Sequence, residues 1–227
     1  MSNTFVKFLS IFWLLAACKL GQAMTIEQVE GDLFAKGPVG GQDYITFKRA
    51  FSSGTVKRIV LVNSHGGDLW TGMAIARMIQ LAGVDTLASG YCISSCSLMF
   101  IAGHQRNFAT GNNPSNTLIG IHGAHNDLKQ VDPALSPQIY ALFKSQLGEK
   151  FDSEIMNQAL YKIQDAGGLF RLREIERNDD ADRVPYFCPK RVTPKAECQR
   201  YPNSDALSLG IVTSSSTINV TLPPSIR

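Results

Sequence analysis

Apolar runs alternate with helical patterns along the first half of the chain, and this alternation constrains the fold more than any other feature. KRIVLVN at 57–63 is rich in β-branched and apolar residues, which predicts a strand buried on both faces. Apolar residues then recur at helical spacing over 69–82, and Gly83 follows as a helix-ending glycine. The alternation continues as strand, helix and strand, predicted at 84–88, 97–103 and 117–122. This order predicts an α/β fold with parallel crossovers.

Composition narrows the class of protein. The chain has 227 residues, of which 44% are hydrophobic and 18% charged, so it is long enough for one ordinary domain with its own core. These values exclude disordered, collagen-like and coiled-coil chains. The net charge of +3 and the lack of a dense Lys/Arg run argue against nucleic acid as a partner.

The N-terminus has the pattern of an export signal. Lys7 is followed by FLSIFWLLAA, an apolar run too short to span a bilayer but suited to the core of a signal peptide. Small residues at the end of this region predict cleavage after Ala23, with 1–23 as the signal peptide. LAAC at 15–18 resembles a bacterial lipobox, and cleavage there would remove 1–17 and leave a lipid anchor on Cys18. Both alternatives stay open, and both predict a periplasmic protein.

The cysteines agree with an oxidising compartment. Without Cys18, four remain as two sequence-local pairs, and we expect disulfides between Cys92 and Cys96 and between Cys188 and Cys198. Three connectivities are possible for four cysteines. Zinc is the rival use, but the double CxxC spacing of a zinc ribbon is absent. We therefore expect no metal site.

The rest of the chain completes one predicted domain over 24–213. Two helices are expected around 136–148 and 153–165. A proline-rich loop at 185–203 holds the second cysteine pair. Residues 214–227 are rich in Ser and Thr, and we expect a mobile tail there.

Three stretches with reactive or glycine residues follow predicted strands, at 63–68, 90–96 and 121–125. Sites in α/β folds gather where strands end. Ser94 would begin a buried helix, where free amides and the helix dipole favour an anion. It could act as a nucleophile with His122 as its base, or it could be only a helix cap.

The chain resembles the Clp protease proteolytic subunit and its relatives in the Clp/crotonase superfamily. The resemblance is carried by LVNSHGGDLWTGMAIARMI, SGYCISSCSLMFIAG and LIGIH, which occur in the family's order. It implies a fold of repeated strand-strand-helix units around a parallel sheet. It also implies Ser94 as nucleophile, His122 as base, and the amides of Gly67 and Ser95 as the oxyanion hole. No cofactor is implied.

The acid of the triad is less defined. IERNDDADRV at 175–184 is similar to the family's acid-bearing segment, which places Asp182 in the third position. Asp179, Asp180 and Asp205 are alternatives, and a solvated acidic loop is the competing interpretation.

Some features depart from the family pattern. His65 replaces a proline, and the C-x-S-x-C element around Ser94 looks like that of exported bacterial relatives, for which activity cannot be assumed. We predict an exported serine peptidase that acts on peptides or proteins without an ATPase partner, and that could form a homo-oligomer. The alternative is an inactive binding or scaffold protein on the same fold. Crotonase-type chemistry is disfavoured, because Ser and His occupy the triad positions.

Overall fold

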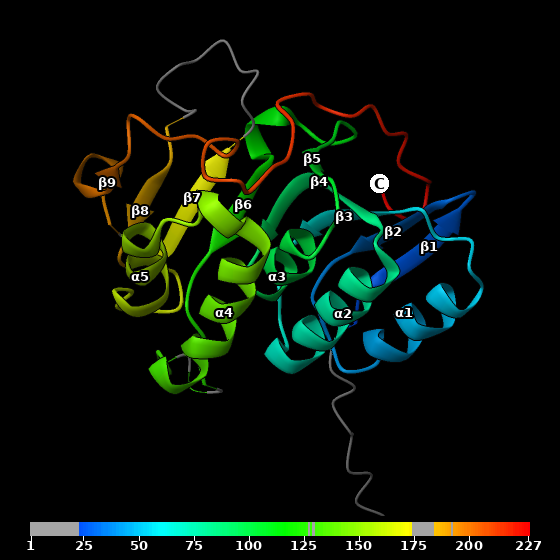
Figure 1. Cartoon of the computed structure of the whole chain (residues 1–227), viewed down its shortest axis with the longest axis horizontal. Coiled ribbons are helices and arrows are strands. Elements are labelled where there is room, and N and C mark those ends of the chain that lie inside the picture. The colour runs from blue at the N-terminus through cyan, green and yellow to red at the C-terminus, as the bar shows by residue number, and fades with distance from the viewer. Residues whose placement is uncertain (1–22, 127, 129, 174–183, 192) are drawn as a thin grey trace, which may run out of the picture.

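The computed structural model describes residues 23–126, 128, 130–173, 184–191 and 193–227. Within these residues, nine strands form one sheet and five α-helices pack against it (Figure 1). The strands are β1 (Thr25–Val29), β2 (Asp32–Lys36), β3 (Arg58–Ser64), β4 (Asp85–Ile93), β5 (Arg106–Phe108), β6 (Leu118–Ile121), β7 (Leu169–Arg173), β8 (Tyr186–Cys188) and β9 (Gln199–Arg200). The helices are α1 (Asp43–Ser52), α2 (Leu69–Ala82), α3 (Ser95–Ile101), α4 (Ser136–Leu147) and α5 (Ser153–Tyr161).

The centre of the sheet is parallel. Its order is β1-β2-β3-β4-β6-β7-β8-β9, with β5 paired to β4 as well. Strands β2, β3, β4 and β6 run parallel, and the pairs at both edges are antiparallel. The predicted α/β fold class with a parallel sheet is thereby confirmed. The parallel centre brings the ends of β3, β4 and β6, and the turns that follow them, to one side of the sheet.

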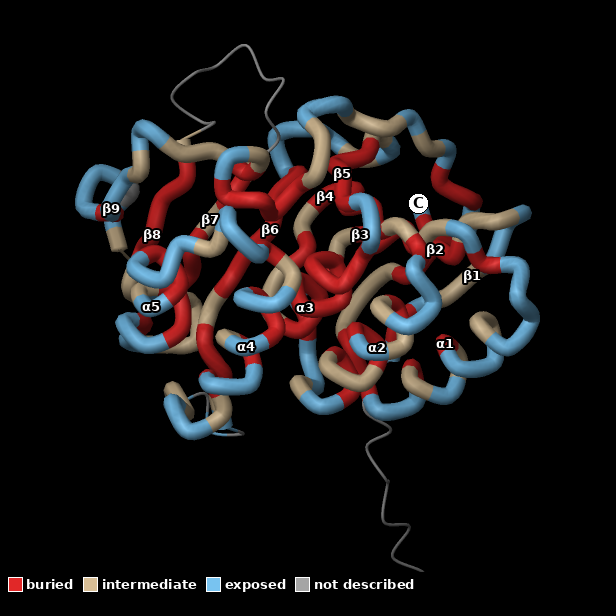
Figure 2. Tube along the Cα trace, viewed as in Figure 1, coloured by how far each residue is buried: buried red, intermediate tan, exposed pale blue. Residues whose placement is uncertain are grey.

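Strand β3 is buried on both faces, as its apolar run predicts. Ile59 and Leu61 join the large core beneath the helices. Val60 and Val62 face the other way, into a second core. All four side chains have 0% exposure, and the buried stretches converge on the middle of the sheet (Figure 2).

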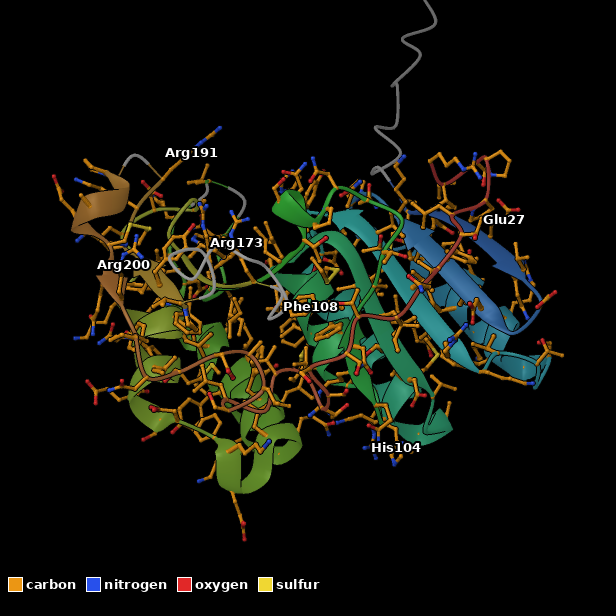
Figure 3. The ribbon with its side chains drawn as sticks, turned by 90° about the horizontal axis from the view of Figure 1, so that it is seen from above. Glu27, His104, Phe108, Arg173, Arg191 and Arg200 are labelled. Carbon is orange, nitrogen blue, oxygen red and sulfur yellow. A yellow bond between two sulfur atoms is a disulfide. The ribbon has the colours of Figure 1, made fainter. Side chains whose placement is uncertain are left out.

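The second core is closed by residues 214–227. Leu222 and Ile226, 5% and 0% exposed, pack with Phe34, Val60 and Val62. Backbone hydrogen bonds from this segment reach β5 and the residues after it, including Ile218 N to the Phe108 carbonyl at 2.9 Å (Figure 3). The expectation of a mobile tail is therefore wrong. The segment is rich in Ser and Thr, but its few apolar residues, among them Leu222 and Ile226, are buried in the second core.

Two further segments differ from their predicted forms. Residues 25–36 form the antiparallel hairpin β1–β2 rather than an amphipathic opening segment. The predicted helix at 153–165 ends at Tyr161, and a turn containing Gly167 and Gly168 follows. In the hairpin the local sequence allows more than one structure, and pairing with the neighbouring strand β3 decides between them.

Two disulfides join sequence-local cysteines. Cys92 pairs with Cys96, with the Cα atoms 5.3 Å apart, and Cys188 pairs with Cys198 at 4.6 Å. The structure thus has the local connectivity among the three that four cysteines allow.

No helix in the described part of the chain is long and apolar enough to cross a membrane. Residues 1–22, with Cys18, lie outside the described residues.

Candidate active site

The turn after β3 is built from two glycines. Gly66 and Gly67 have positive φ angles of 81° and 153°, and the loop before α1 holds the turn through Val39. Val39 donates to the Gly66 carbonyl at 2.9 Å and accepts from the Asp68 amide at 2.9 Å. A Cβ on Gly66 would lie 2.5 Å from the Ile93 carbonyl oxygen, closer than real Cβ contacts come. Glycine at this position therefore lets the turn approach the end of β4.

Ser94 lies between the end of β4 and the start of α3. Its φ of 59° with ψ of −127° is a conformation that side-chain-bearing residues rarely adopt. The Ser94 amide donates to the Gly120 carbonyl at 3.0 Å, and Ser97 Oγ donates to the Ser94 carbonyl at 2.6 Å. The Cys92–Cys96 disulfide spans the same turn. These bonds maintain a strained backbone at one serine, as often occurs at functional sites.

His122 follows the end of β6 directly. The Nδ1 atom lies 2.7 Å from the carbonyl oxygen of Gly123. Burial lowers the pKa of His122 to about 4, the Gly123 hydrogen bond opposes this, and His125 adds to it. The ring is therefore neutral at pH 7. Since only a protonated nitrogen can donate to a carbonyl, Nδ1 carries the hydrogen and Nε2 has the free lone pair that a general base needs.

Gly123, the residue after His122, positions the His122 ring by packing against α5. The Gly123 amide donates to Ala159 at the end of α5 at 3.1 Å. A Cβ at position 123 would meet the Leu160 carbonyl oxygen at 2.2 Å. Close packing against α5 thus holds His122 in place through its neighbour.

The two amides proposed as oxyanion donors have no acceptor in the described part of the chain. The Gly67 amide lies between the two hydrogen bonds made with Val39 and takes part in neither. Ser95 is the first residue of α3, so its amide has no partner within the helix. The ideal Cβ position on Gly66 is 2.8 Å from the Ser95 nitrogen, which shows how closely the glycine turn approaches this amide.

A single cavity joins these groups. Its volume is about 730 Å³, and Gly67, Ser94, Ser95 and His122 all line it. The structure thus brings together four of the five catalytic and oxyanion residues expected from the sequence. Ser94 Oγ and His122 form no hydrogen bond with each other here. Active-site hydrogen bonds are often long in proteins without substrate and tighten when the substrate binds.

The predicted acid is not among these groups. Asp182, like its alternatives Asp179 and Asp180, lies outside the described residues. Asp205 is described, and its Oδ1 accepts from the amides of Leu207 and Ser208 at 2.9 and 2.6 Å. Asp205 therefore caps a local turn and does not line the cavity.

Other cavity residues had no clear signal in the sequence. The ring of His125 lies 4.8 Å from the ring of His122, and His125 interacts electrostatically with Asp165. The carboxylate of Asp165 accepts from the amides of Gly167 and Arg191 at 2.7 and 3.0 Å. These hydrogen bonds lower the pKa of Asp165, although burial acts in the opposite direction.

The apolar side of the cavity is formed by Leu69, Trp70, Leu98, Leu135 and Ile139. Leu69 and Trp70 come from α2, Leu98 from α3, and Leu135 and Ile139 from the start of α4, so spacing along the chain could not group all of them.

Within the described ranges, no group of three His, Cys, Asp or Glu side chains is placed to hold a metal ion.

His65, which replaces the family's proline, stacks on Tyr91 with the ring centres 4.2 Å apart. The stacked ring reinforces the contact between the turn after β3 and the end of β4.

The chain was compared with protein-family models by sequence and with solved structures by fold. Residues 52–131, which include Gly67, Ser94 and His122, match the family model described as Clp protease. No curated protein matches the sequence. Among solved structures, ClpP1 from Listeria monocytogenes is similar at 15% identity and a TM-score of 0.50, covering 86% of this chain and 94% of that chain. A variant of the 1510-N membrane-bound stomatin-specific protease is similar at 14% identity and a TM-score of 0.46, covering 82% and 76%. The family match over residues 52–131 and the fold shared with ClpP1 are consistent with a Clp protease-like protein of the Clp/crotonase fold.

Proposed function

We propose that the protein is an exported serine peptidase in which Ser94 is the nucleophile and His122 the general base. The observation that carries this proposal is the convergence of Ser94, the His122 ring and two unsatisfied amides on one cavity. His122 Nε2 would take the proton of Ser94 Oγ as the oxygen attacks a peptide carbonyl. It would then return the proton to the leaving amine.

The amides of Gly67 and Ser95 would bind the developing oxyanion. Such donors cost no reorganisation during the reaction, because the backbone already holds them in place. Losing one donor of this kind typically costs about 3–4 kcal/mol of transition-state stabilisation. The free N-terminal amides of α3 add a favourable dipole at the same point.

The acid that would orient the His122 ring is part of this proposal. Asp182 is our first choice from the sequence, in which case its carboxylate would replace the Gly123 carbonyl as the partner of Nδ1. In the geometry described here, that carbonyl holds Nδ1 by itself at 2.7 Å. A main-chain carbonyl can fix the tautomer, but it stabilises the charged imidazolium less than a carboxylate does.

Substrate, location and assembly follow from the same proposal. The apolar side of the cavity favours peptides with an apolar side chain next to the scissile bond. Export to the periplasm, with or without a lipid anchor at Cys18, would separate the protein from ATP-driven unfoldases. It would therefore act on peptides or flexible protein segments without an ATPase partner, alone or as a homo-oligomer.

The test is labelling of the purified, disulfide-intact protein with a fluorophosphonate probe, which reacts only with activated serines. We expect labelling that is lost in Ser94→Ala and in His122→Ala. Ser145→Ala and His104→Ala are the matched controls, because both residues are exposed, lie outside the cavity and should not affect labelling. Labelling that persists in Ser94→Ala would contradict the assignment of the nucleophile.

One observation favours a second function. Ser94 and His122 are not hydrogen-bonded, and the Nδ1 partner of His122 is a backbone carbonyl. A binding or scaffold protein on the same fold would use the cavity to hold a peptide without cleaving it. A well-folded protein that fails to label, but binds apolar peptides that compete with one another, would support this alternative.

A further inference from the structure

The backbone nitrogen of Met24 lies against a buried carboxylate where the chain enters the fold. Ala23 is exposed, whereas Met24 is only 7% exposed. The Met24 nitrogen is 3.0 Å from one carboxylate oxygen of Asp43 and 3.2 Å from the other. Asp43 itself is 1% exposed at the start of α1. Met24 therefore contacts an acid that water does not reach.

The charge of Asp43 is not balanced by a side chain. Its other donor is the amide of Gly40 at 2.7 Å, and among the described residues no Lys, Arg or His forms an ion pair with it. Burial raises the pKa of Asp43, and the amides of Gly40 and Met24 only partly oppose this. A buried carboxylate with neutral donors alone is costly. A positive charge at the Met24 nitrogen would remove that cost.

We propose that the Ala23–Met24 peptide bond is the processing site of the leader, and that the α-ammonium group released there pairs with Asp43. An endopeptidase of the signal-peptidase type would add one water molecule across this bond. Ala23 would keep the new carboxylate, and the Met24 nitrogen would become an α-amine that takes up a proton. Cleavage precedes folding, because Met24 is buried once the fold has formed.

The same geometry argues against the lipobox alternative. Cleavage before Cys18 would leave residues 18–23 attached, and the Met24 nitrogen would then stay a neutral amide with one hydrogen. An α-ammonium has three hydrogens and a full charge. A backbone amide can share its one hydrogen between both Asp43 oxygens, as the two distances allow, but only the ammonium also compensates their charge. This proposal rests on export but not on catalysis, so probe labelling and N-terminal analysis can fail independently.

The first experiment determines the N-terminus. The full chain is expressed with its own leader in a bacterium, and the exported protein is analysed by intact mass and N-terminal sequencing. We expect a chain that begins at Met24 without added acyl groups. An acylated chain that begins at Cys18, or a start at any other residue, would overturn the proposal.

The second experiment tests the ion pair in the exported protein. The α-amine is acetylated with a limiting amine-reactive ester near neutral pH, and peptide mass analysis follows the reaction at Met24. An opposite charge in contact raises the pKa of an amine by about one to three units, so we expect acetylation at least roughly tenfold slower in the folded protein than in urea. Equal rates in both states would refute the pairing.

A matched pair of variants locates the partner. Asp43→Asn should bring the acetylation rate of the folded protein close to that in urea, whereas Asp85→Asn, which alters a partly exposed acid, should not. Slow acetylation in a folded Asp43→Asn protein would contradict the role of Asp43. If Asp43→Asn does not fold, the pH dependence of acetylation in the folded wild-type protein decides the question, because burial alone lowers the pKa of the amine and an ion pair with Asp43 raises it.

Discussion

At the residue scale, the environment of His122 changes its acid–base chemistry. Its ordinary pKa is 6.5, and burial lowers it to about 4. A base with such a pKa is fully deprotonated at pH 7 and needs no carboxylate to remain so. Its weakness is low basicity, because a base performs best when its pKa is near the working pH.

The rate of fluorophosphonate labelling should therefore stay constant from about pH 8 down to about pH 5. It should fall to half near pH 4, where His122 becomes protonated. Single-turnover labelling measured across this range checks the prediction. A half-point near pH 6.5 would show that His122 is not buried as described, or that a carboxylate raises its pKa.

The same shift links stability to pH. Between pH 4 and 6.5 the unfolded chain binds a proton at His122 and the folded chain does not, so the free energy of unfolding rises with pH through this window. The gain is complete above pH 6.5 and amounts to about 1–3 kcal/mol. Urea unfolding at pH 4.5 and 7 should show a smaller pH dependence in His122→Gln than in the wild type. His104→Gln, at an exposed site, should leave the dependence unchanged.

Gly66 should tolerate no side chain. In Gly66→Ala the new Cβ would meet the Ile93 carbonyl oxygen at 2.5 Å and require φ near 81°. The turn must then move away from Ser94 and Ser95, which we expect to slow labelling at least about 100-fold and to cost about 1–3 kcal/mol of stability. Gly54→Ala is the control, since it also has positive φ but open space around it. Equal labelling in the two variants would show that the turn does not form part of the site.

At the element scale, the turn between β4 and α3 determines whether Ser94 is presented correctly. A disulfide spans the turn, and hydrogen bonds to Gly120 and Ser97 fix its backbone. A reducing cytosol would not maintain such a bond, whereas an oxidising compartment would. The covalent link thus suits the proposed location.

Removing this link should impair the site more than the fold. In Cys92→Ser/Cys96→Ser, we expect labelling to fall at least about tenfold while the circular dichroism spectrum stays native, because the strained turn can relax. Cys188→Ser/Cys198→Ser is the matched control, with the same chemistry at a disulfide that joins the end of β8 to the residue before β9 and does not line the cavity. Equal losses in the two double variants would mean that the disulfides stabilise the protein only in general.

Much of this element structure could be predicted from the sequence. The strand at 57–63, the helix at 69–82 and the elements that present Ser94 and His122 follow from periodicity and glycine positions. The hairpin formed by 25–36 could not be, because both strands are short, β1 is largely exposed, and β2 depends on pairing with β3. The apolar side of the cavity could not be predicted either, since tertiary packing alone brings Trp70 and Ile139 to one place.

At the scale of the whole molecule, the two cores differ in how they are closed. Helices cover the larger core, and an irregular segment covers the smaller one. Figure 3 shows this segment crossing the sheet near Phe108 and reaching β1 near Glu27, whose carboxylate accepts from Ser225 Oγ. Buried side chains, and not regular structure, anchor the segment.

Leu222→Ala should therefore destabilise the protein by about 2–4 kcal/mol, the range for truncating a buried leucine. Urea unfolding followed by tryptophan fluorescence measures this loss. Leu128→Ala is the control, because that leucine is 76% exposed. A change below about 0.5 kcal/mol at Leu222 would restore the original expectation of a mobile tail.

Closure of the smaller core by residues 218–226 also sets the order of events during synthesis. Val60 and Val62 are made early, yet the residues that shield them are added more than 150 positions later. Until then the nascent chain exposes an apolar sheet face and cannot lock into its final form. A polypeptide with this arrangement would complete its fold only when its last residues are available, which would suit the proposed export of an unfolded chain through a secretion channel.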